Sequence, residues 1–385
     1  MKLLLYSHDW APAVGGTQTI MRLLAQGLSG QSLGNSEPIE LTLVTNTPRG
    51  EMNDAAASYR ILRKPTFWQL AAVIRHSDLV HLAGPSLAPL SLGWLLNKPV
   101  VVEHHGFQTI CPNGQLFYAP TQGRCIGYFM AGNYSECIAC NRGNGYAKSI
   151  SQWLLTFVRR WLCKRVAANI TPTDWLASQL QLPRMTTIYH GIPDATSDGG
   201  DRTGDKPIQF AFLGRLVSTK NVAVLVRAMA ELRGDGIACR LLIVGDGPER
   251  TALEELASKL GVQTVISFMR YVPEADLGRT LQDVTSVVSP GASGEVFGLA
   301  AAENMRHGRI AIVPENSAIA EVVGDSGLTF PESDAKGLAA AMRRLITEPN
   351  LRGRLSLAAR ERCRSLFRDD AMVDAHLALY RSLER

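Results

Sequence analysis

Two glutamates, eight residues apart, lie in a segment whose composition changes from turn-forming to helix-forming residues. The segment is GEVFGLAAAEN, residues 294–304, and its glutamates are Glu295 and Glu303. Its glycines resist helix formation, whereas the run that begins at Leu299 favours it. We expect Glu295 in a loop and Glu303 about one turn inside a helix that starts near Gly298. Such a loop leads into a helix N-terminus, where free backbone N–H groups attract anions.

Other residues with complementary chemistry follow nearby apolar segments. Arg215 and Lys220 lie in the segment that follows FAFL (210–213), and the turn GDGPE (245–249) follows LLIV. In open α/β domains, ligands bind at the carboxyl ends of the strands. Two cations and a helix N-terminus at one such edge suit a diphosphate. Glu303 lies about 7.5 Å further along the helix, where a carboxylate could accept hydrogen bonds from the two hydroxyls of a ribose.

The elements that must position these residues alternate along the whole chain. Short apolar segments typical of buried parallel strands are separated by longer segments with helical periodicity. The expected strands are 2–7, 39–45, 78–84, 98–106, 208–215, 239–247, 264–271, 284–290 and 309–316, and expected helices include 21–28, 66–77, 221–233 and 248–261. Alternation of this kind in both halves predicts an α/β protein with two doubly wound domains.

Length and composition agree with two domains. A chain of 385 residues with 46% hydrophobic residues can form two cores. The segment 194–207 is rich in Asp, Gly, Ser and Thr and is the predicted linker. We therefore expect an N-terminal domain over 1–193, a C-terminal domain over 207–365, and a final helix within 366–385 that returns to the first domain.

The charge distribution restricts the class of partner. Residues 1–195 contain 16 Lys and Arg against 10 Asp and Glu, whereas residues 196–385 contain 24 against 25. The basic excess of the first half suits an anionic partner or a membrane surface, and no nucleic-acid-binding motif is present. The start MKLLLYSHDW is typical of a first strand rather than a signal peptide, and no apolar run reaches membrane-spanning length. These features predict a cytoplasmic protein whose seven cysteines are thiols or metal ligands.

The ordered motifs of the second half resemble those of glycosyltransferase family 4, which are retaining nucleotide-sugar transferases of GT-B fold. The resemblance is dense over 208–345 and looser in the first half, where GGTQTIMRLLAQGL and VVEHHG carry it. The motifs are GRLVSTKN, VGDGPE, FMRYVP, SPGASGEVFGLAAAENMRHG and AIAEVVGDSGLTF. The resemblance implies two Rossmann-like domains facing across a cleft, with an acceptor-binding N-terminal domain and a donor-binding C-terminal domain. Asn304, in place of a small residue, and the segment NSAIAE depart from the family pattern.

The resemblance also implies a role for individual residues. Arg215 and Lys220 would neutralise the donor diphosphate and replace a divalent ion, so no cofactor is expected for catalysis. Glu295 would contact the transferred sugar, Glu303 the ribose, and His105 the sugar from the other domain. The remaining implied substrate contacts are the backbone amides of Phe297, Gly298 and Leu299, the loop glycines Gly15 and Gly16, and Tyr271 and Val272 near the base.

The expected reaction is transfer of a hexose from a nucleotide diphosphate sugar to a glycan or lipid-linked acceptor. With no evident carboxylate nucleophile, the leaving diphosphate would deprotonate the incoming hydroxyl on the same face of the sugar. UDP-glucose or another UDP-hexose is the favoured donor, and GDP-mannose is the alternative. A GT-B epimerase or phosphorylase and a non-catalytic nucleotide-sugar sensor remain alternatives. A dinucleotide-dependent oxidoreductase is disfavoured because APAVGGTQ lacks Gly-x-Gly-x-x-Gly.

An insertion at 111–140 carries four closely spaced cysteines, including a Cys-x2-Cys pair. They are Cys111, Cys125, Cys137 and Cys140. This set suits a structural zinc ion that would stabilise a long irregular loop, and unpaired thiols are the alternative.

The segment 147–169 combines an apolar stripe with basic residues. Leu154, Leu155, Val158, Trp161, Leu162 and Val166 form the stripe, while Arg159, Arg160 and Lys164 lie on the other side. A core helix with solvated cations is the favoured interpretation. A helix at the surface of an anionic membrane, near a lipid-linked acceptor, is the alternative.

Overall fold

The structure is a computed structural model that describes residues 1–384 except 14, 33–37, 51–52, 193–206 and 292. The chain forms two compact units. The N-terminal unit comprises Met1–Pro120, Cys125–Pro193 and Phe367–Arg385, and the C-terminal unit comprises Thr121–Arg124 and Asp194–Leu366. Apart from Pro207, the predicted linker lies outside the described residues.

The N-terminal unit is built on a seven-stranded parallel sheet. Its strand order is β3-β2-β1-β4-β5-β8-β9. The order reverses next to β1, which places the carboxyl ends of β1 and β4 at the switch point where ligands bind in such sheets. The strands are β1 (Lys2–Ser7), β2 (Glu40–Thr45), β3 (Arg60–Arg63), β4 (Leu79–Ala83), β5 (Val100–Glu103), β8 (Ala168–Thr171) and β9 (Met185–Thr187).

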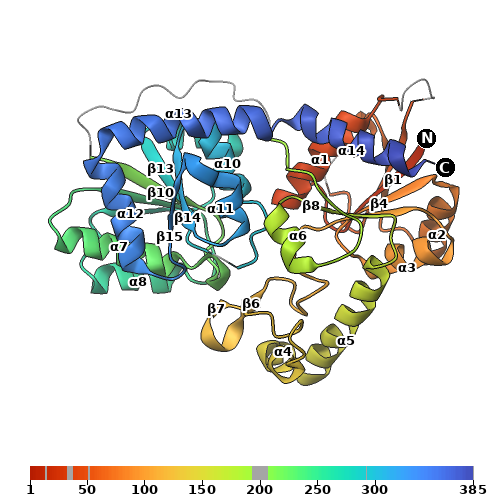
Figure 1. Ribbon diagram of the computed structural model, residues 1–385, viewed down its shortest axis with the longest axis horizontal. Coiled ribbons are helices and arrows are strands. Elements are labelled where there is room, and N and C mark those ends of the chain that lie inside the picture. Colours follow the sequence, from red (N-terminus) through yellow and green to blue (C-terminus); the bar gives the residue numbers. More distant parts are fainter. Residues whose placement is uncertain (14, 33–37, 51–52, 193–206, 292, 385) are drawn as a thin grey trace. The chain divides into compact units, whose positions relative to one another are not determined.

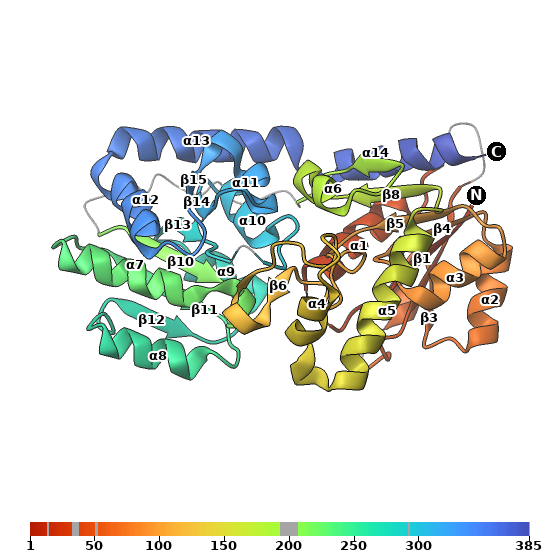
Figure 2. The same cartoon turned by 60° about the horizontal axis from the view of Figure 1, so that its bottom comes forward.

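Helices α1 and α14 lie side by side in this unit, and α2 contacts α3, which contacts α5 (Figures 1 and 2). Every fourth residue or so of α1 is apolar and buried, including Ile20, Leu24 and Leu28, so one face packs inward. The helices are α1 (Gly16–Leu28), α2 (Phe67–His76), α3 (Leu87–Leu95), α4 (Tyr134–Cys140), α5 (Tyr146–Cys163), α6 (Asp174–Leu180) and α14 (Asp369–Leu383). Short elements of this unit are η1 (Asp54–Ala56), η3 (Arg142–Asn144) and β6 (Phe117–Tyr118). Along the chain, η2 (Ala119–Thr121) crosses the boundary between the units, and β7 (Gly123–Arg124) belongs to the C-terminal unit.

The C-terminal unit contains a six-stranded parallel sheet with the order β12-β11-β10-β13-β14-β15. The strands are β10 (Gln209–Leu213), β11 (Arg240–Val244), β12 (Ile266–Met269), β13 (Val284–Val288), β14 (Ile310–Pro314) and β15 (Leu328–Phe330). The helices are α7 (Val222–Gly234), α8 (Arg250–Lys259), α9 (Glu274–Thr280), α10 (Leu299–Arg306), α11 (Ala318–Val323), α12 (Ala335–Thr347) and α13 (Pro349–Leu366), with η4 (Ser218–Lys220) and η5 (Gly324–Ser326).

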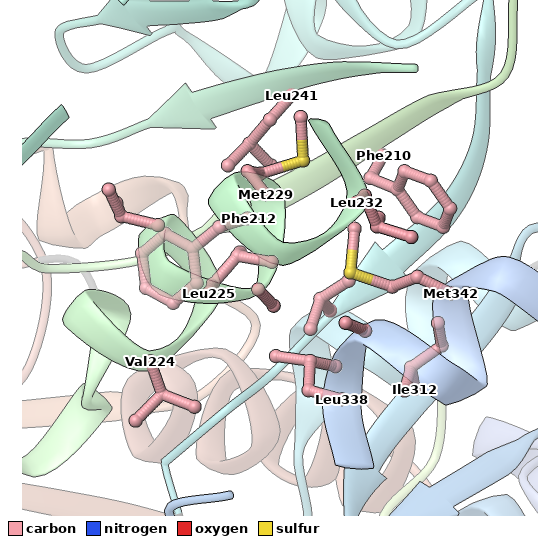
Figure 3. Close-up of a cluster of buried hydrophobic side chains, with 14 of the residues drawn as sticks. Phe210, Phe212, Val224, Leu225, Met229, Leu232, Leu241, Ile312, Leu338 and Met342 are labelled. Atoms are coloured by element: carbon pink, nitrogen blue, oxygen red, sulfur yellow. The ribbon is translucent and has the colours of Figure 1, made fainter. Parts of the chain in front are cut away.

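The core of this unit lies between the sheet and helices α7 and α12 (Figure 3). Phe210 and Phe212 project from β10 toward Met229 of α7 and Met342 of α12, and all four side chains are at most 2% exposed. Two phenylalanines at alternate positions point to the same face of a strand, which explains why β10 carries so much of this contact.

The prediction of two doubly wound α/β domains is confirmed. Every expected strand segment contains an observed strand, and the four expected helix segments correspond to α1, α2, α7 and α8. Four strands of the two sheets were not predicted, namely β3, β8, β9 and β15. Each is only three or four residues long, too short for a clear apolar period.

The favoured interpretation of 147–169 as a core helix is wrong for much of its apolar stripe. Leu154, Leu155, Val158 and Trp161 of α5 are exposed, whereas Leu162 is buried. The basic side was also misplaced. Arg159 and Arg160 are only partly exposed, and the Arg160 guanidinium donates a hydrogen bond to the Leu180 carbonyl (2.7 Å). The helix packs through one side on α3 and α4 and leaves the remainder of its apolar surface uncovered.

Candidate functional site

In the C-terminal unit, two of the predicted site residues make direct contact. Lys220 lies in η4, after β10, and Glu295 lies in the loop after β13. The Lys220 ammonium forms an ion pair with the Glu295 carboxylate, and both side chains are roughly a quarter exposed. Because β10 and β13 are adjacent and parallel, their carboxyl ends share one edge of the sheet. Arg215, two residues after β10, projects from that edge and is exposed.

Close backbone packing holds the Glu295 loop against η4. A Cβ atom on Gly291 would lie 2.4 Å from the Thr219 carbonyl oxygen and 2.8 Å from the Lys220 Cα. Both distances are too short for any side chain, so only glycine permits this approach. The loop therefore places Glu295 next to Lys220 through contacts between main chains.

The N-terminus of α10 has the predicted position. Glu295 lies in a loop, and α10 begins at Leu299 after Gly298, whose φ of 88° and ψ of 50° are left-handed. No side chain caps the helix, and the amides of Ala301 and Ala302 donate to the Gly298 carbonyl (3.0 and 3.1 Å). Phe297 and Gly298 are buried, and Glu303 is partly buried in the helix. An uncapped N-terminus at a strand edge suits an anion.

The GDG turn joins the same edge. At Gly245 and Gly247, with φ of 143° and 158°, added Cβ atoms would lie 1.9 Å from the Gly214 carbonyl oxygen and 2.3 Å from that of Leu216. The Leu216 amide donates to the Asp246 carbonyl (2.9 Å). Gly214 and Leu216, the residues on either side of Arg215, both contact this turn. These contacts fix the position of the loop that carries Arg215.

Tyr271 and Val272 follow β12, two strands away from β10 on the same edge. The Tyr271 ring is 69% exposed, so it presents a free aromatic face at this end of the sheet. The described contacts do not connect Tyr271 or Val272 with Lys220, and their predicted place near a base stays a prediction.

The departure at Asn304 has a structural explanation. Asn304 is buried, its amide donates to the Ala300 carbonyl (2.7 Å), and its side-chain oxygen accepts from the buried Arg309 (3.3 Å). Arg309 also donates to the Leu281 carbonyl (2.9 Å). This residue therefore connects α10 with the end of α9, which a smaller side chain could not do.

The N-terminal unit has its own pocket at the carboxyl ends of β1, β4 and β5. The pocket has a volume of 310 Å³ and its lining includes His105, Gln108 and the first turn of α1. Gly15 precedes α1 and Gly16 is its first residue. The other lining residues are Ser7, His8, Asp9, Thr17, Gln18, Ala83, Gly84, Pro85, Ser86 and Arg159. The structure therefore places His105 near the glycine loop that precedes α1. A binding site in this unit that uses both requires this proximity.

Beneath this pocket, the carboxylate of Glu103 is surrounded by histidines. Its Oε2 lies 3.1 Å from Nε2 of His81 and 3.3 Å from Nε2 of His376, and its Oε1 lies 3.5 Å from Nε2 of His105 and 3.4 Å from Nε2 of His190. Glu103 is 1% exposed. Roles for Glu103, His81, His190 and His376 were not predicted from the sequence. The one available signal was the presence of ionisable residues inside the apolar segments DLVHLAG and VVVEHHG.

The surroundings of this cluster alter its proton affinities. Burial alone would raise the pKa of Glu103, but interactions with the four surrounding imidazoles, His105 foremost, hold that pKa well below its usual value. Burial lowers the pKa of His105 to about 3, against the opposing effect of the Glu103 charge. Glu103 is therefore an anion and His105 a neutral imidazole near neutral pH.

The four cysteines of the insertion lie near one another. Burial and the neighbouring thiols of Cys111, Cys125 and Cys140 raise the pKa of Cys137 to about 12. Within the described chain, however, no three of these sulfur atoms lie within 4.8 Å of one another. The Asn113 side chain accepts from the Cys111 thiol (2.9 Å) and donates to Cys140 Sγ (3.6 Å), so it lies between them. The structural zinc site stays a prediction.

Comparison with known proteins finds that the chain is similar to glycosyltransferases. Residues 198–362 match the model of "Glycosyl transferases group 1". Lipopolysaccharide core biosynthesis glycosyltransferase LpsD of Rhizobium meliloti is 35% identical over 223 residues, which are 56% of this chain and 61% of that protein. The GDP-mannose-dependent alpha-(1-6)-phosphatidylinositol monomannoside mannosyltransferase of Mycolicibacterium smegmatis is 26% identical over 381 residues, covering 93% of this chain and 92% of that protein.

A solved structure resembles the chain over nearly its whole length. Anabaena HepE in complex with UDP has a TM-score of 0.72 and 15% identity, and the match covers 99% of this chain and 100% of HepE. The chain thus has the two Rossmann-like α/β domains of the GT-B fold. The matched family model and the relatives named above describe glycosyltransferases, and the match spans about three fifths of the length of LpsD.

We expect Gly298→Ala to destabilise the α10 N-terminus. A Cβ at this left-handed position would lie 2.5 Å from Ile319 Cδ1, so the free energy of unfolding should fall by about 1–3 kcal/mol. Urea denaturation followed by circular dichroism measures this. Gly234→Ala is the matched control, because no atom lies within 4 Å of its added Cβ. Equal stability of the two variants would contradict the constraint.

Proposed function

We propose that the chain is a retaining glycosyltransferase that transfers a hexose, with UDP-glucose or another UDP-hexose as the favoured donor, to a glycan or lipid-linked acceptor. The observation that carries this proposal is the contact between Lys220 and Glu295 at the sheet edge that ends in the uncapped α10 N-terminus. A cation, a carboxylate and a helix N-terminus on one edge provide complementary groups for a diphosphate and for sugar hydroxyls.

The ion pair indicates how the donor would be received. Without donor, Lys220 is neutralised by Glu295. A bound diphosphate would take over the Lys220 charge together with Arg215, and Glu295 would then be released to accept hydrogen bonds from sugar hydroxyls. As the bond to the sugar breaks, negative charge grows on the diphosphate, and the two cations and the α10 amides stabilise that charge. The departing oxygen deprotonates the acceptor hydroxyl, and the acceptor oxygen then bonds to the anomeric carbon on the same face that the diphosphate leaves. The configuration at the anomeric carbon is therefore retained.

The choice of donor and acceptor draws on the relatives. UDP is the nucleotide named for HepE, whereas the mycobacterial relative is named as GDP-mannose-dependent, which keeps a mannosyltransferase as the alternative. Both curated relatives have names that refer to lipid-bound glycans, a lipopolysaccharide core and a phosphatidylinositol monomannoside. A glycan or lipid-linked acceptor is the proposal that fits both names.

UDP should stabilise the protein more than other nucleotides. At a concentration about 100 times its dissociation constant, a ligand adds about 2.7 kcal/mol, which corresponds to a Tm increase of about 5 °C or more for a domain of this size. Thermal unfolding with UDP, GDP and ADP in parallel measures the difference. A larger increase with GDP would favour the mannosyltransferase alternative, and no increase with any nucleotide would contradict the proposed function.

Lys220→Ala should lower the rate of sugar transfer by about 10²–10³-fold, because one charge that stabilises the leaving diphosphate is lost. Hydrolysis of the UDP-hexose without acceptor, followed as UDP release, gives a readout that needs no known acceptor and separates an enzyme from a sensor. Lys259→Ala is the matched control, since Lys259 is an exposed lysine in the last turn of α8, at the opposite edge of the sheet. A near-normal rate in Lys220→Ala would refute the mechanism.

We also propose that the N-terminal unit contacts an anionic membrane surface through α3 and α5. Trp94 of α3 and Trp161 of α5 are 48% and 43% exposed, and their rings lie 5.2 Å apart. The guanidinium of exposed Arg165 lies 3.8 Å from the centre of the Trp161 ring, and Lys164 is exposed beside it. Exposed tryptophans next to cations suit the boundary between lipid headgroups and acyl chains. None of the described helices is both long and apolar enough to cross a bilayer.

Reversing the exposed cations of α5 and of the two residues that follow it should weaken membrane binding. The triple variant Lys148→Glu, Lys164→Glu, Arg165→Glu should reduce partition onto vesicles of phosphatidylcholine and phosphatidylglycerol by at least about 100-fold, since each cation contributes about 1 kcal/mol near such a surface. Vesicle sedimentation measures the partition.

The matched control reverses three exposed cations of the C-terminal unit: Lys259, Lys336 and Arg354. The control should bind vesicles as the unmodified chain does. Equal loss in both triple variants, or no binding by the unmodified chain, would contradict the membrane proposal.

A further inference from the structure

The Glu103 cluster has two halves with different hydrogen bonding. On the Oε2 side, the partners are satisfied. His376 Nδ1 lies 2.8 Å from the Met372 carbonyl oxygen. His81 Nδ1 lies 2.6 Å from the Tyr380 hydroxyl. Both rings are thereby fixed with Nε2 directed at Glu103, and they hold the carboxylate in one orientation.

On the Oε1 side, two of the polar atoms lack such partners. Among the described residues, neither Glu103 Oε1 nor His105 Nε2 makes a well-aligned hydrogen bond. Both are buried, with side-chain exposures of 1% for Glu103 and 7% for His105. A buried acceptor and a buried ring nitrogen left in this way each lose the hydrogen bonds that water would have supplied. The arrangement is therefore incomplete without another group between them.

The spacing of the three donor atoms identifies that group. Oε1 of Glu103 lies 3.5 Å from His105 Nε2 and 3.4 Å from His190 Nε2, and all three atoms lie within 4.8 Å of one another. Two ligands of a tetrahedral ion are about 3.3–3.4 Å apart when each metal–ligand bond is about 2.0–2.1 Å. The observed separations match that spacing, whereas they are long for direct hydrogen bonds.

The geometry points to a divalent transition-metal site formed by Glu103 Oε1, His105 Nε2 and His190 Nε2. Two imidazoles and one carboxylate are typical ligands of Zn²⁺ and of related first-row ions, and they leave a fourth position open. His105 also lines the pocket at the carboxyl ends of β1, β4 and β5, which provides the path of entry and room for a water or a ligand oxygen. The inference does not depend on the proposed donor site.

The site gives His376 and His81 a defined role. They orient the carboxylate through Oε2, so that Oε1 faces the other two histidines. Because His376 lies in α14, this final helix positions a ligand that β5 supplies. In this arrangement, His105 Nε2 binds the metal, and contact with a sugar would come through the metal's fourth position or another part of the ring.

Cobalt binding tests the site directly. The chain is stripped of metal with a chelator under reducing conditions, dialysed and titrated with Co²⁺ in calorimetry and absorption spectroscopy. Two of the four insertion cysteines, which could compete for the metal, are replaced in a Cys137→Ser, Cys140→Ser background. We expect one equivalent of Co²⁺ per chain with the d–d bands of a four- or five-coordinate ion and no thiolate-to-cobalt charge-transfer band.

Variants assign the ligands. His105→Ala and His190→Ala should each lower the affinity for Co²⁺ and Zn²⁺ by at least about 100-fold, more than loss of an outer partner would. His8→Ala should leave it unchanged, since His8 lines the same pocket but is exposed and is not among the proposed ligands. Circular dichroism confirms that each variant is folded, and a variant that fails this check is replaced by His→Gln at the same position.

Three results would overturn the proposal. They are no metal uptake by the folded, cysteine-substituted chain, uptake that persists in both histidine variants, and uptake in the unsubstituted chain that occurs only with thiolate bands. The first would assign the space between Oε1 and Nε2 to water, and the last would assign the metal to the cysteine insertion.

Discussion

Close main-chain packing at the carboxyl edge of the second sheet is the constraint on which the candidate donor site depends. Gly245 and Gly247 contact the loop around Arg215, and Gly291 contacts Lys220, at distances that no Cβ atom could occupy. These contacts fix the loops after β10, β11 and β13 as one surface. Charged side chains can then meet there without a dedicated scaffold, because the strands already end side by side.

The N-terminal unit is organised around a different constraint, a carboxylate that cannot reach water. A buried charge requires partners, and Glu103 obtains them from four separate parts of the chain, including the final helix. Helix α14 therefore contributes more than apolar contact with α1. Its His376 lies within hydrogen-bond distance of Glu103, and its Tyr380 within hydrogen-bond distance of His81, which connects the last residues of the chain with the first sheet.

The two units also differ in how they expose apolar surface. The C-terminal unit buries its large side chains between the sheet and helices α7 and α12 (Figure 3). The N-terminal unit leaves several of its tryptophans and leucines exposed on α3 and α5. These exposed apolar side chains next to cations are the observation on which the proposed membrane contact rests.

Three features could be predicted from the amino-acid sequence alone. They are the alternation of strands and helices, the start of α10 after Gly298, and the gathering of Arg215, Lys220 and Glu295 at one edge of the sheet. These features depend on local periodicity, on glycine conformations and on the rule that parallel strands end together. The three-dimensional fold was needed to show which residues surround Glu103, because positions 81, 105, 190 and 376 share no local sequence pattern. It also decided that the apolar stripe of α5 is exposed, since periodicity shows that a face is apolar but not what covers it.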